Sequence, residues 1–235
     1  KDMFLVVIQL GAILAVAVMY FQKLNPFSPS KSARQKQATW ALWIKIVIAC
    51  IPAAVLGLLF DDWMEAHLYN AYVVAATLII YGVLFIVLEN SSITANPSIT
   101  KVGHVSTKTA LFIGLFQLLS LVPGTSRSGS TILGAMVLGC SRGVAAEFSF
   151  FLGIPVMFGA SFLKLVKFFV KGNVLTGPQI FYTILGMAIA FGVSVYSIQF
   201  LMGYVRRHDF KFFGYYRIIL GVVVLAYFGI TALAA

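Results

Sequence analysis

Charged residues are scarce in this sequence. Of its 235 residues, 10% are charged and 60% are hydrophobic, and the mean hydropathy is +0.96. A soluble domain carries about 25% charged residues. The composition therefore excludes an ordinary soluble domain and predicts an all-α polytopic membrane protein.

Cysteine and histidine are also rare. The two cysteines, Cys50 and Cys140, both lie in apolar segments, so neither a disulfide framework nor a zinc site is indicated. The three histidines (His67, His104 and His208) all fall outside the predicted membrane spans. This placement disfavours an intramembrane serine protease, which would need a histidine base beside its serine.

The excess of basic residues lies mostly in the loops. The net charge of +10 would suggest nucleic acid binding in a soluble protein. Here the positive-inside rule and anionic lipid headgroups explain it more simply. Loop 22–45 has basic residues without acidic ones and is predicted to be cytoplasmic, whereas the acidic segment 61–65 is predicted to be external. The expected partners are therefore membrane lipids and no nucleic acid.

Long uncharged runs predict about six full membrane spans, because a helix needs about 20 apolar residues to cross a bilayer. The chain begins at Lys1 without an initiator methionine, shortly before the first span, so we expect it to be part of a longer protein. The predicted spans are 3–21, 41–60, 68–88, 144–166, 178–203 and 213–234.

Residues 109–141 do not fit a simple span. A continuous helix of this length would measure about 50 Å, which is too long for a bilayer, and Pro123-Gly124 interrupts it near the middle. Two arms of about 13 and 11 residues remain, each about half a membrane long. The segment is predicted to be a re-entrant helical hairpin. Since irregular backbone at that depth must be buried in protein or line a polar cavity, the break also predicts a cavity.

The order of segments predicts an inverted-topology repeat within one transmembrane domain, 1–235. Residues 109–235 hold the hairpin followed by three spans, and residues 1–89 hold three spans without a hairpin. Three crossings invert orientation, so the two halves would enclose a site at the middle of the membrane. By this symmetry, a second hairpin is expected before residue 1.

Arg127 lies at the interruption and is the strongest functional signal. An arginine at bilayer depth costs ~2.5–3.5 kcal/mol and needs an anionic partner. Three partners remain open: Glu147, a carboxylate preceding Lys1, or an anionic ligand. Glu147 either orients Arg127 or lies near a helix start, and Gln9 is either a further supporting residue or an interhelical hydrogen-bonder. Arg217, about one turn into the last span, is predicted to extend to the membrane interface.

The residues around Arg127 favour a phosphate ligand. Glycines allow close approach, hydroxyls supply donors, and the second arm begins near Ser128 with its free N–H groups and positive dipole end. Alternatively, Ser128 or Ser130 is only a helix cap. The predicted catalytic residues are Arg127, Ser126 and Ser128, and the predicted substrate-binding residues are Gly124, Thr125, Gly129, Ser130 and Thr131.

Three stretches resemble the undecaprenyl-diphosphate phosphatase (bacitracin-resistance) family. "PGTSRSGST" (123–131) fits the family motif PGxSRSxxT, and "AAEFSFFLGIP" (145–155) and "VIQLGAILAV" (7–16) are similar in order and spacing. The resemblance implies a bacterial inner-membrane enzyme that hydrolyses undecaprenyl diphosphate to undecaprenyl phosphate and inorganic phosphate. It further implies a role in peptidoglycan synthesis, two re-entrant hairpins, a divalent cation (Mg²⁺ or Ca²⁺) and a site open to the outer face.

One family motif is absent: a glutamate pair ExxxE followed by PxSSTGH. We expect it in roughly 40 residues preceding Lys1, the length of one hairpin, and the likeness to the family implies that it holds the metal ligands. The sequence does not decide whether the nucleophile is a serine or a water. It also leaves open which prenyl chain length is preferred and whether the protein forms a homodimer.

Other functional classes remain for comparison. A lipid-carrier flippase or secondary transporter would share the inverted repeat and the midplane anion site. Phosphatases with an SRxxxxxH motif are disfavoured, because Leu133 stands where their histidine belongs.

Overall fold

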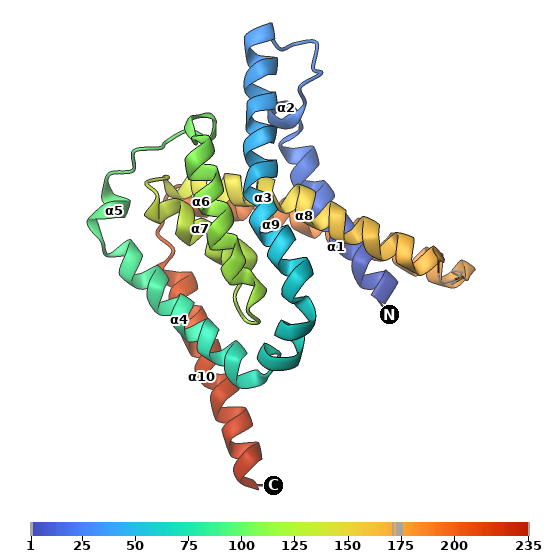
Figure 1. Cartoon of the computed structure of the whole chain (residues 1–235), viewed down its shortest axis with the longest axis vertical. Coiled ribbons are helices and arrows are strands. Elements are labelled where there is room, and N and C mark those ends of the chain that lie inside the picture. Colours follow the sequence, from blue (N-terminus) through green and yellow to red (C-terminus); the bar gives the residue numbers. More distant parts are fainter. Residues whose placement is uncertain (1, 171, 173–175, 235) are drawn as a thin grey trace. The chain divides into compact units, whose positions relative to one another are not determined.

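The computed structural model describes residues 2–170, 172 and 176–234, and within them the chain is helical without β-strands (Figure 1). Lys1, before which a further hairpin is expected, lies outside the described residues. Five of these helices are long and apolar enough to cross a membrane. They are α3 (Ala33–Leu68), α4 (Ala71–Glu89), α8 (Arg142–Val170), α9 (Gly177–Val205) and α10 (Lys211–Ala234).

The first predicted span is shorter than expected. Helix α1 (Asp2–Met19) ends where Tyr20 leaves the helical conformation, with φ −104° and ψ 16°, and the short α2 (Phe21–Leu24) follows. The apolar stretch Met3–Met19 spans only about 26 Å, below the ~30 Å hydrocarbon thickness. The described residues therefore contain five span-length helices, where the hydropathy pattern predicts six.

Helix α3 extends beyond both ends of the predicted span 41–60. Its start is fixed by a reciprocal capping box, in which Gln35 N–H donates to Ser32 Oγ (3.3 Å) and Ser32 N–H donates to Gln35 Oε1 (2.8 Å). Its end lies at Leu68, past an acidic stretch. Hydropathy detects only the apolar middle of such a helix, because the polar turns at its ends resemble loop sequence.

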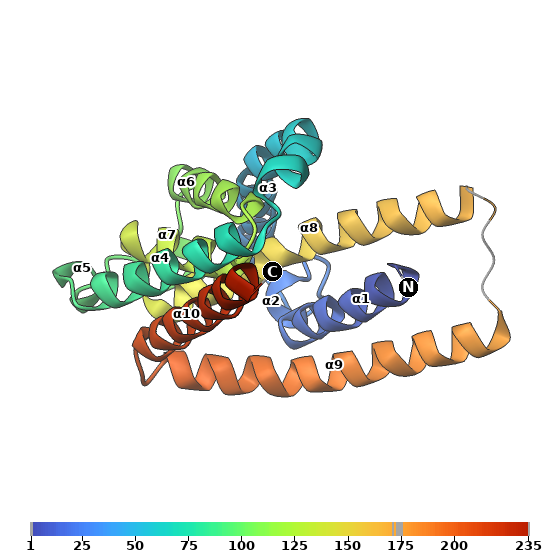
Figure 2. The ribbon, with the colours of Figure 1, turned by 90° about the horizontal axis from the view of Figure 1, so that it is seen from below.

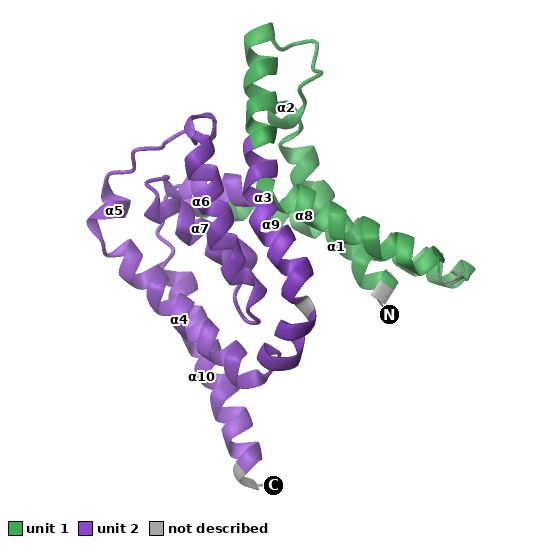
Figure 3. Cartoon of the chain, in the orientation of Figure 1, with its two compact units in different colours: residues 1–44, 150–204 green, residues 45–149, 205–235 purple. Residues whose placement is uncertain are grey.

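The chain divides into two compact units, coloured separately in Figure 3. Unit 1 comprises residues 1–44 and 150–204, and unit 2 comprises residues 45–149 and 205–235. Each unit takes segments from both predicted repeats, 1–89 and 109–235. The two units reflect which segments contact one another and do not test whether the two predicted repeats are related by symmetry. The inverted repeat therefore stays a prediction.

Unit 1 is built on a close crossing of α1 and α9 (Figure 2). A side chain at Gly11 would overlap the backbone carbonyl of Met187, and one at Gly186 would touch Phe4. The loop after α2 is tied down by Trp43, whose indole N–H donates to the Leu24 carbonyl at 2.8 Å.

Unit 2 is built on the antiparallel pair α4 and α10, which pack through small residues. A Cβ at Gly82 would lie 2.7 Å from the Gly214 carbonyl oxygen, and one at Gly214 would lie 2.8 Å from the Gly82 carbonyl oxygen. Seven residues further along α10, a Cβ at Gly221 would lie 2.8 Å from the Ala75 carbonyl oxygen. Small residues permit this backbone approach, which is the usual way in which helices associate in membranes.

The predicted helical hairpin is present in unit 2. Its arms are α6 (Thr107–Leu118) and α7 (Arg127–Val137), of 12 and 11 residues. The single turn η2 (Leu119–Leu121) and the segment 122–126 join them. Gly134 packs directly against the Phe116 ring, which holds the arms together. The interruption is therefore confirmed, and its re-entrant placement in a membrane stays a prediction.

Both ends of the hairpin are anchored. At the tip, Gly124 adopts φ +83° and lies against the backbone of Val74, and Thr77 Oγ1 donates to the Pro123 carbonyl at 2.8 Å. At the base, Ile99 bridges the end of α7. Its N–H donates to the Gly139 carbonyl and its carbonyl accepts from Ser141 N–H, both at 2.9 Å. Two short elements, α5 (Ser92–Ala95) and η1 (Val102–His104), lie in the connection that carries Ile99.

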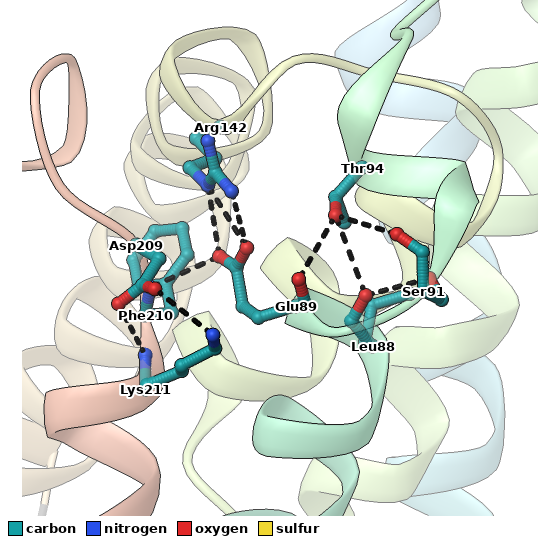
Figure 4. A network of polar contacts seen from close by, with 8 residues as sticks. All are labelled: Leu88, Glu89, Ser91, Thr94, Arg142, Asp209, Phe210 and Lys211. Carbon is teal, nitrogen blue, oxygen red and sulfur yellow. Dashed lines mark hydrogen bonds and ion pairs between the residues drawn. The ribbon is translucent and has the colours of Figure 1, made fainter.

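A buried carboxylate joins three helix ends in unit 2 (Figure 4). The Glu89 side chain is 0% exposed and accepts from Arg142 through both oxygens, with Nε at 2.9 and 3.1 Å. The same carboxylate accepts from Phe210 N–H at 2.9 Å. It therefore links the end of α4 to the start of α8 and to the residue before α10.

Replacing Glu89 with glutamine should destabilise the protein markedly. Glu89→Gln leaves the Arg142 guanidinium without its charge partner, a loss of about 3 kcal/mol, at the lower end for buried pairs because Arg142 is 34% exposed. Thermal unfolding in detergent measures the effect. Asp209→Asn is the matched control, since its 3.5 Å pair with Lys211 is exposed and should contribute little. Equal changes in the two melting temperatures would contradict this account.

Candidate active site

The site begins with the first turn of α7. Ser126 is the helix cap, and its Oγ accepts from Gly129 N–H at 3.2 Å and lies 3.1 Å from Ser128 Oγ. The alternative that Ser128 or Ser130 is the helix cap is therefore wrong. Helix geometry leaves the N–H groups of Arg127 and Ser128 without an intrahelical acceptor. These donors, with the half-buried Ser126 and Ser128 hydroxyls, are available to a ligand.

Ser130 and Thr131 turn inward instead. Both are fully buried, and both hydroxyls donate to the Arg127 carbonyl at 3.0 Å. Thr131 Oγ1 also lies 2.7 Å from Ser149 Oγ on α8. In this arrangement the two hydroxyls position α7 against α8, so their predicted contribution to ligand binding is indirect.

Arg127 is half-buried and makes one weak hydrogen bond, from Nη1 to the Ser149 carbonyl at 3.4 Å. In the part of the chain that the structure describes, no ion pair involves Arg127. Glu147 is buried on α8, two residues before Ser149. That Glu147 orients Arg127 stays a prediction. The supporting role of Gln9, an exposed residue of α1 in unit 1, also stays a prediction.

Arg217 is the residue that the sequence analysis missed. From α10, its guanidinium lies against Gly129, where an added Cβ would be 3.1 Å from Nη2 and 3.5 Å from Cζ. Its Nη1 is buried and has no hydrogen-bond partner among the described residues. The predicted extension to the membrane interface is therefore wrong. The same rule that singled out Arg127, the cost of an arginine within a span, could have identified Arg217.

Thr125 and Gly124 shape the turn before α7. Thr125 is 9% exposed and lies near the buried Tyr81 of α4, which also lies near Arg217. Gly124 provides the positive φ that reverses the chain. The structure thus brings the predicted segment 124–129 together with three residues not predicted: Tyr81, Ser149 and Arg217.

The electrostatics of this cluster favour an anion. Two guanidinium groups, those of Arg127 and Arg217, lie at the positive end of the α7 dipole. Among the described residues neither Arg127 nor Arg217 takes part in an ion pair, so neither site arginine is neutralised in this way. Guanidinium groups, hydroxyls and helix N–H groups together are the donors that bind phosphate groups.

Span-length helices, together with an interrupted hairpin whose tip gathers these donors, define a helical membrane protein with a candidate anion site. The comparisons with known proteins narrow the class. A family model described as bacitracin resistance protein BacA matches residues 1–223, and the chain belongs to this family.

Relatives named undecaprenyl-diphosphatase align with nearly the whole chain. The Streptococcus thermophilus protein is 58% identical over 226 residues, which cover 96% of this chain and 78% of the relative. The Lactiplantibacillus plantarum protein is 58% identical over 227 residues (97% and 82%), and the Enterococcus faecalis protein is 54% identical over 226 residues (96% and 82%). This confirms the family resemblance drawn from "PGTSRSGST".

Gly124 should not tolerate a side chain. Gly124→Ala forces a residue with a Cβ into φ +83°, which costs about 1–2 kcal/mol, and it also drives the Cβ into the Val74 backbone. A clear drop in the melting temperature in detergent is the expected result. Gly103→Ala is the matched control, because a Cβ there meets no atom within 4 Å. A Gly124→Ala protein as stable as Gly103→Ala would contradict the turn geometry described here.

Proposed function

We propose that this protein hydrolyses undecaprenyl diphosphate to undecaprenyl phosphate and inorganic phosphate, and so recycles the lipid carrier of peptidoglycan synthesis. The observation that supports it best is Arg127 at the first turn of α7. It lies beside free N–H groups and hydroxyls and has no carboxylate partner among the described residues. Membership of the family, whose curated relatives are named for this substrate, gives the anion its identity.

In the proposed reaction, an oxygen nucleophile attacks the terminal phosphorus, and the bond from that phosphorus to the bridging oxygen breaks. The electron pair of this bond stays on the departing prenyl phosphate. Negative charge spreads over the three equatorial oxygens of the transferred group. Arg127 stabilises that charge through its planar pair of donors, and the N–H groups at the start of α7 hold the diphosphate. Ser126 and Ser128 orient the phosphate oxygens. If the nucleophile is a water, its proton passes to the departing phosphates; if it is a serine, a water then hydrolyses the phosphoserine and releases inorganic phosphate.

The prenyl tail requires an apolar surface close to this turn. A shallow, open pocket of about 310 Å³ lies beside the hairpin tip in unit 2 and is lined by apolar side chains. We propose that it accommodates part of the tail while the diphosphate lies at α7, with the site open to the outer face of the bacterial cell membrane. The lining residues are Leu56, Phe60, Trp63, Met64, Leu68, Leu118, Leu121 and Val122.

Arg127→Ala should reduce kcat about 10²–10³-fold, because one preorganised donor to the developing charge is lost. Arg127→Lys should also lose most of the activity, since an ammonium cannot replace the two-pronged guanidinium. Phosphate release from undecaprenyl diphosphate in detergent measures both. Arg207→Gln, at an exposed loop position, is the control and should remain active. Near-normal turnover in Arg127→Lys would disprove the clamp.

The same assay separates the enzyme from a flippase or transporter. Detergent micelles have no two sides, so transport has no meaning there, whereas hydrolysis proceeds. A wild-type protein that binds the lipid in detergent and releases no phosphate would favour the transporter alternative.

We also propose that activity depends on a divalent cation, Mg²⁺ or Ca²⁺. No group of three or more His, Cys, Asp or Glu side chains that could hold a metal occurs among the described residues. The cluster at α7 offers only cations and neutral donors, so these residues do not fit a metal by themselves. Its ligands would therefore be carboxylates outside this cluster.

Chelation tests the cation requirement. Dialysis of the wild-type protein against EDTA should abolish phosphate release, and Mg²⁺ or Ca²⁺ should restore it. Protein dialysed without EDTA is the control. Full activity in the presence of excess EDTA would show that no exchangeable cation is needed.

A further inference from the structure

We propose that Arg217 is a second substrate-binding guanidinium, which donates to the diphosphate alongside Arg127. This inference rests on the proposed function and deepens it. The first observation is the buried Nη1, which has no hydrogen-bond partner among the described residues. A buried charged donor without an acceptor is costly, so a guanidinium placed this way indicates a missing anionic partner.

The second observation is the position of Arg217. Its guanidinium lies against Gly129, the third residue of α7, on the turn that begins with Arg127. A Cβ at Gly129 would approach Nη2 to 3.1 Å, closer than carbon and nitrogen ordinarily pack. Glycine at this position therefore lets the planar group lie close to the free N–H donors of the helix start.

The third observation is the sign of the local charge. A guanidinium near the positive end of a helix dipole is destabilised by that dipole. Within the described residues, neither arginine belongs to an ion pair, and Glu89 is committed to Arg142. A multiply charged ligand relieves this repulsion, and a diphosphate has enough oxygens to accept from both arginines.

Neutral residues pack around Arg217, and none of those described accepts a hydrogen bond from its Nη1. Tyr81 lies near its guanidinium and near Thr125 at the turn before α7. The flanking contacts of α10, at Gly214 and Gly221, set the helix against α4. Arg217 is therefore positioned by packing, while its buried donor stays available to the ligand.

The test compares Arg217→Gln and Arg217→Lys with the control Arg207→Gln, an exposed arginine in the same unit. We expect Arg217→Gln to raise the KM for undecaprenyl diphosphate and the inhibition constant of methylenediphosphonate about tenfold to a hundredfold, the value of a charge-assisted hydrogen bond. Arg217→Lys should recover part of this loss. Gly129→Ala, which displaces the guanidinium, should raise both constants in the same direction.

A melting temperature measured without ligand distinguishes binding from a purely structural role. If Arg217 binds the ligand, Arg217→Gln should be at least as stable as wild type, because a source of repulsion is removed. Destabilisation of Arg217→Gln with unchanged KM and inhibition constant would overturn the proposal.

The stabilisation of each variant by methylenediphosphonate separates this inference from the proposed function. If wild type melts at a higher temperature with the diphosphonate and Arg217→Gln does not, Arg217 binds the anion even where no turnover is found. If both respond equally, the inference fails whether or not wild type is a phosphatase.

Discussion

The structure depends on one constraint: backbone donors and acceptors that leave a helix inside an apolar chain must be satisfied by the protein itself. The hairpin meets this constraint at each interruption. Ser106 and Ser126 cap its two arms, Thr77 donates to the carbonyl of Pro123, and Ile99 bridges the backbone where α7 ends. The donors left over are those at the start of α7. At these breaks the protein satisfies its own backbone, whereas the N–H donors at the start of α7 stay open to a ligand.

The arginines of unit 2 differ in whether a carboxylate lies beside them. Glu89 is buried in a bidentate pair with Arg142 that joins three elements. Arg142 is thereby neutralised and becomes structural, whereas Arg127 and Arg217 are not. A neighbouring carboxylate, and not the depth of burial, is what separates Arg142 from the two arginines proposed to bind the substrate.

Local features could be predicted from the sequence, and contacts between distant segments could not. Helix length and Pro123-Gly124 were sufficient to place both arms of the hairpin, and the motif around Arg127 gave the family. The helix cap could not be assigned from the sequence, because Ser126, Ser128 and Ser130 are all serines and are equally suitable as caps. Arg217, Tyr81 and Ser149 come from three other helices, and a single sequence has no signal for which helices meet. The end of α1 at Met19 was missed because an apolar run continues past the point where the backbone turns.

The glycine contacts between α4 and α10 have a consequence beyond packing. Gly214, Arg217 and Gly221 are spaced three and four residues apart and so share one face of α10, and Gly82 follows directly after Tyr81 on α4. The glycines fix the register between α4 and α10. A slip of one residue would turn α10 by about 100° and carry Arg217 away from α7. The alignment of the two helices thus fixes the geometry of the site. A methyl group added at Gly82 or Gly214, outside the candidate site, would therefore displace Arg217 as well as disturb the packing of α4 and α10.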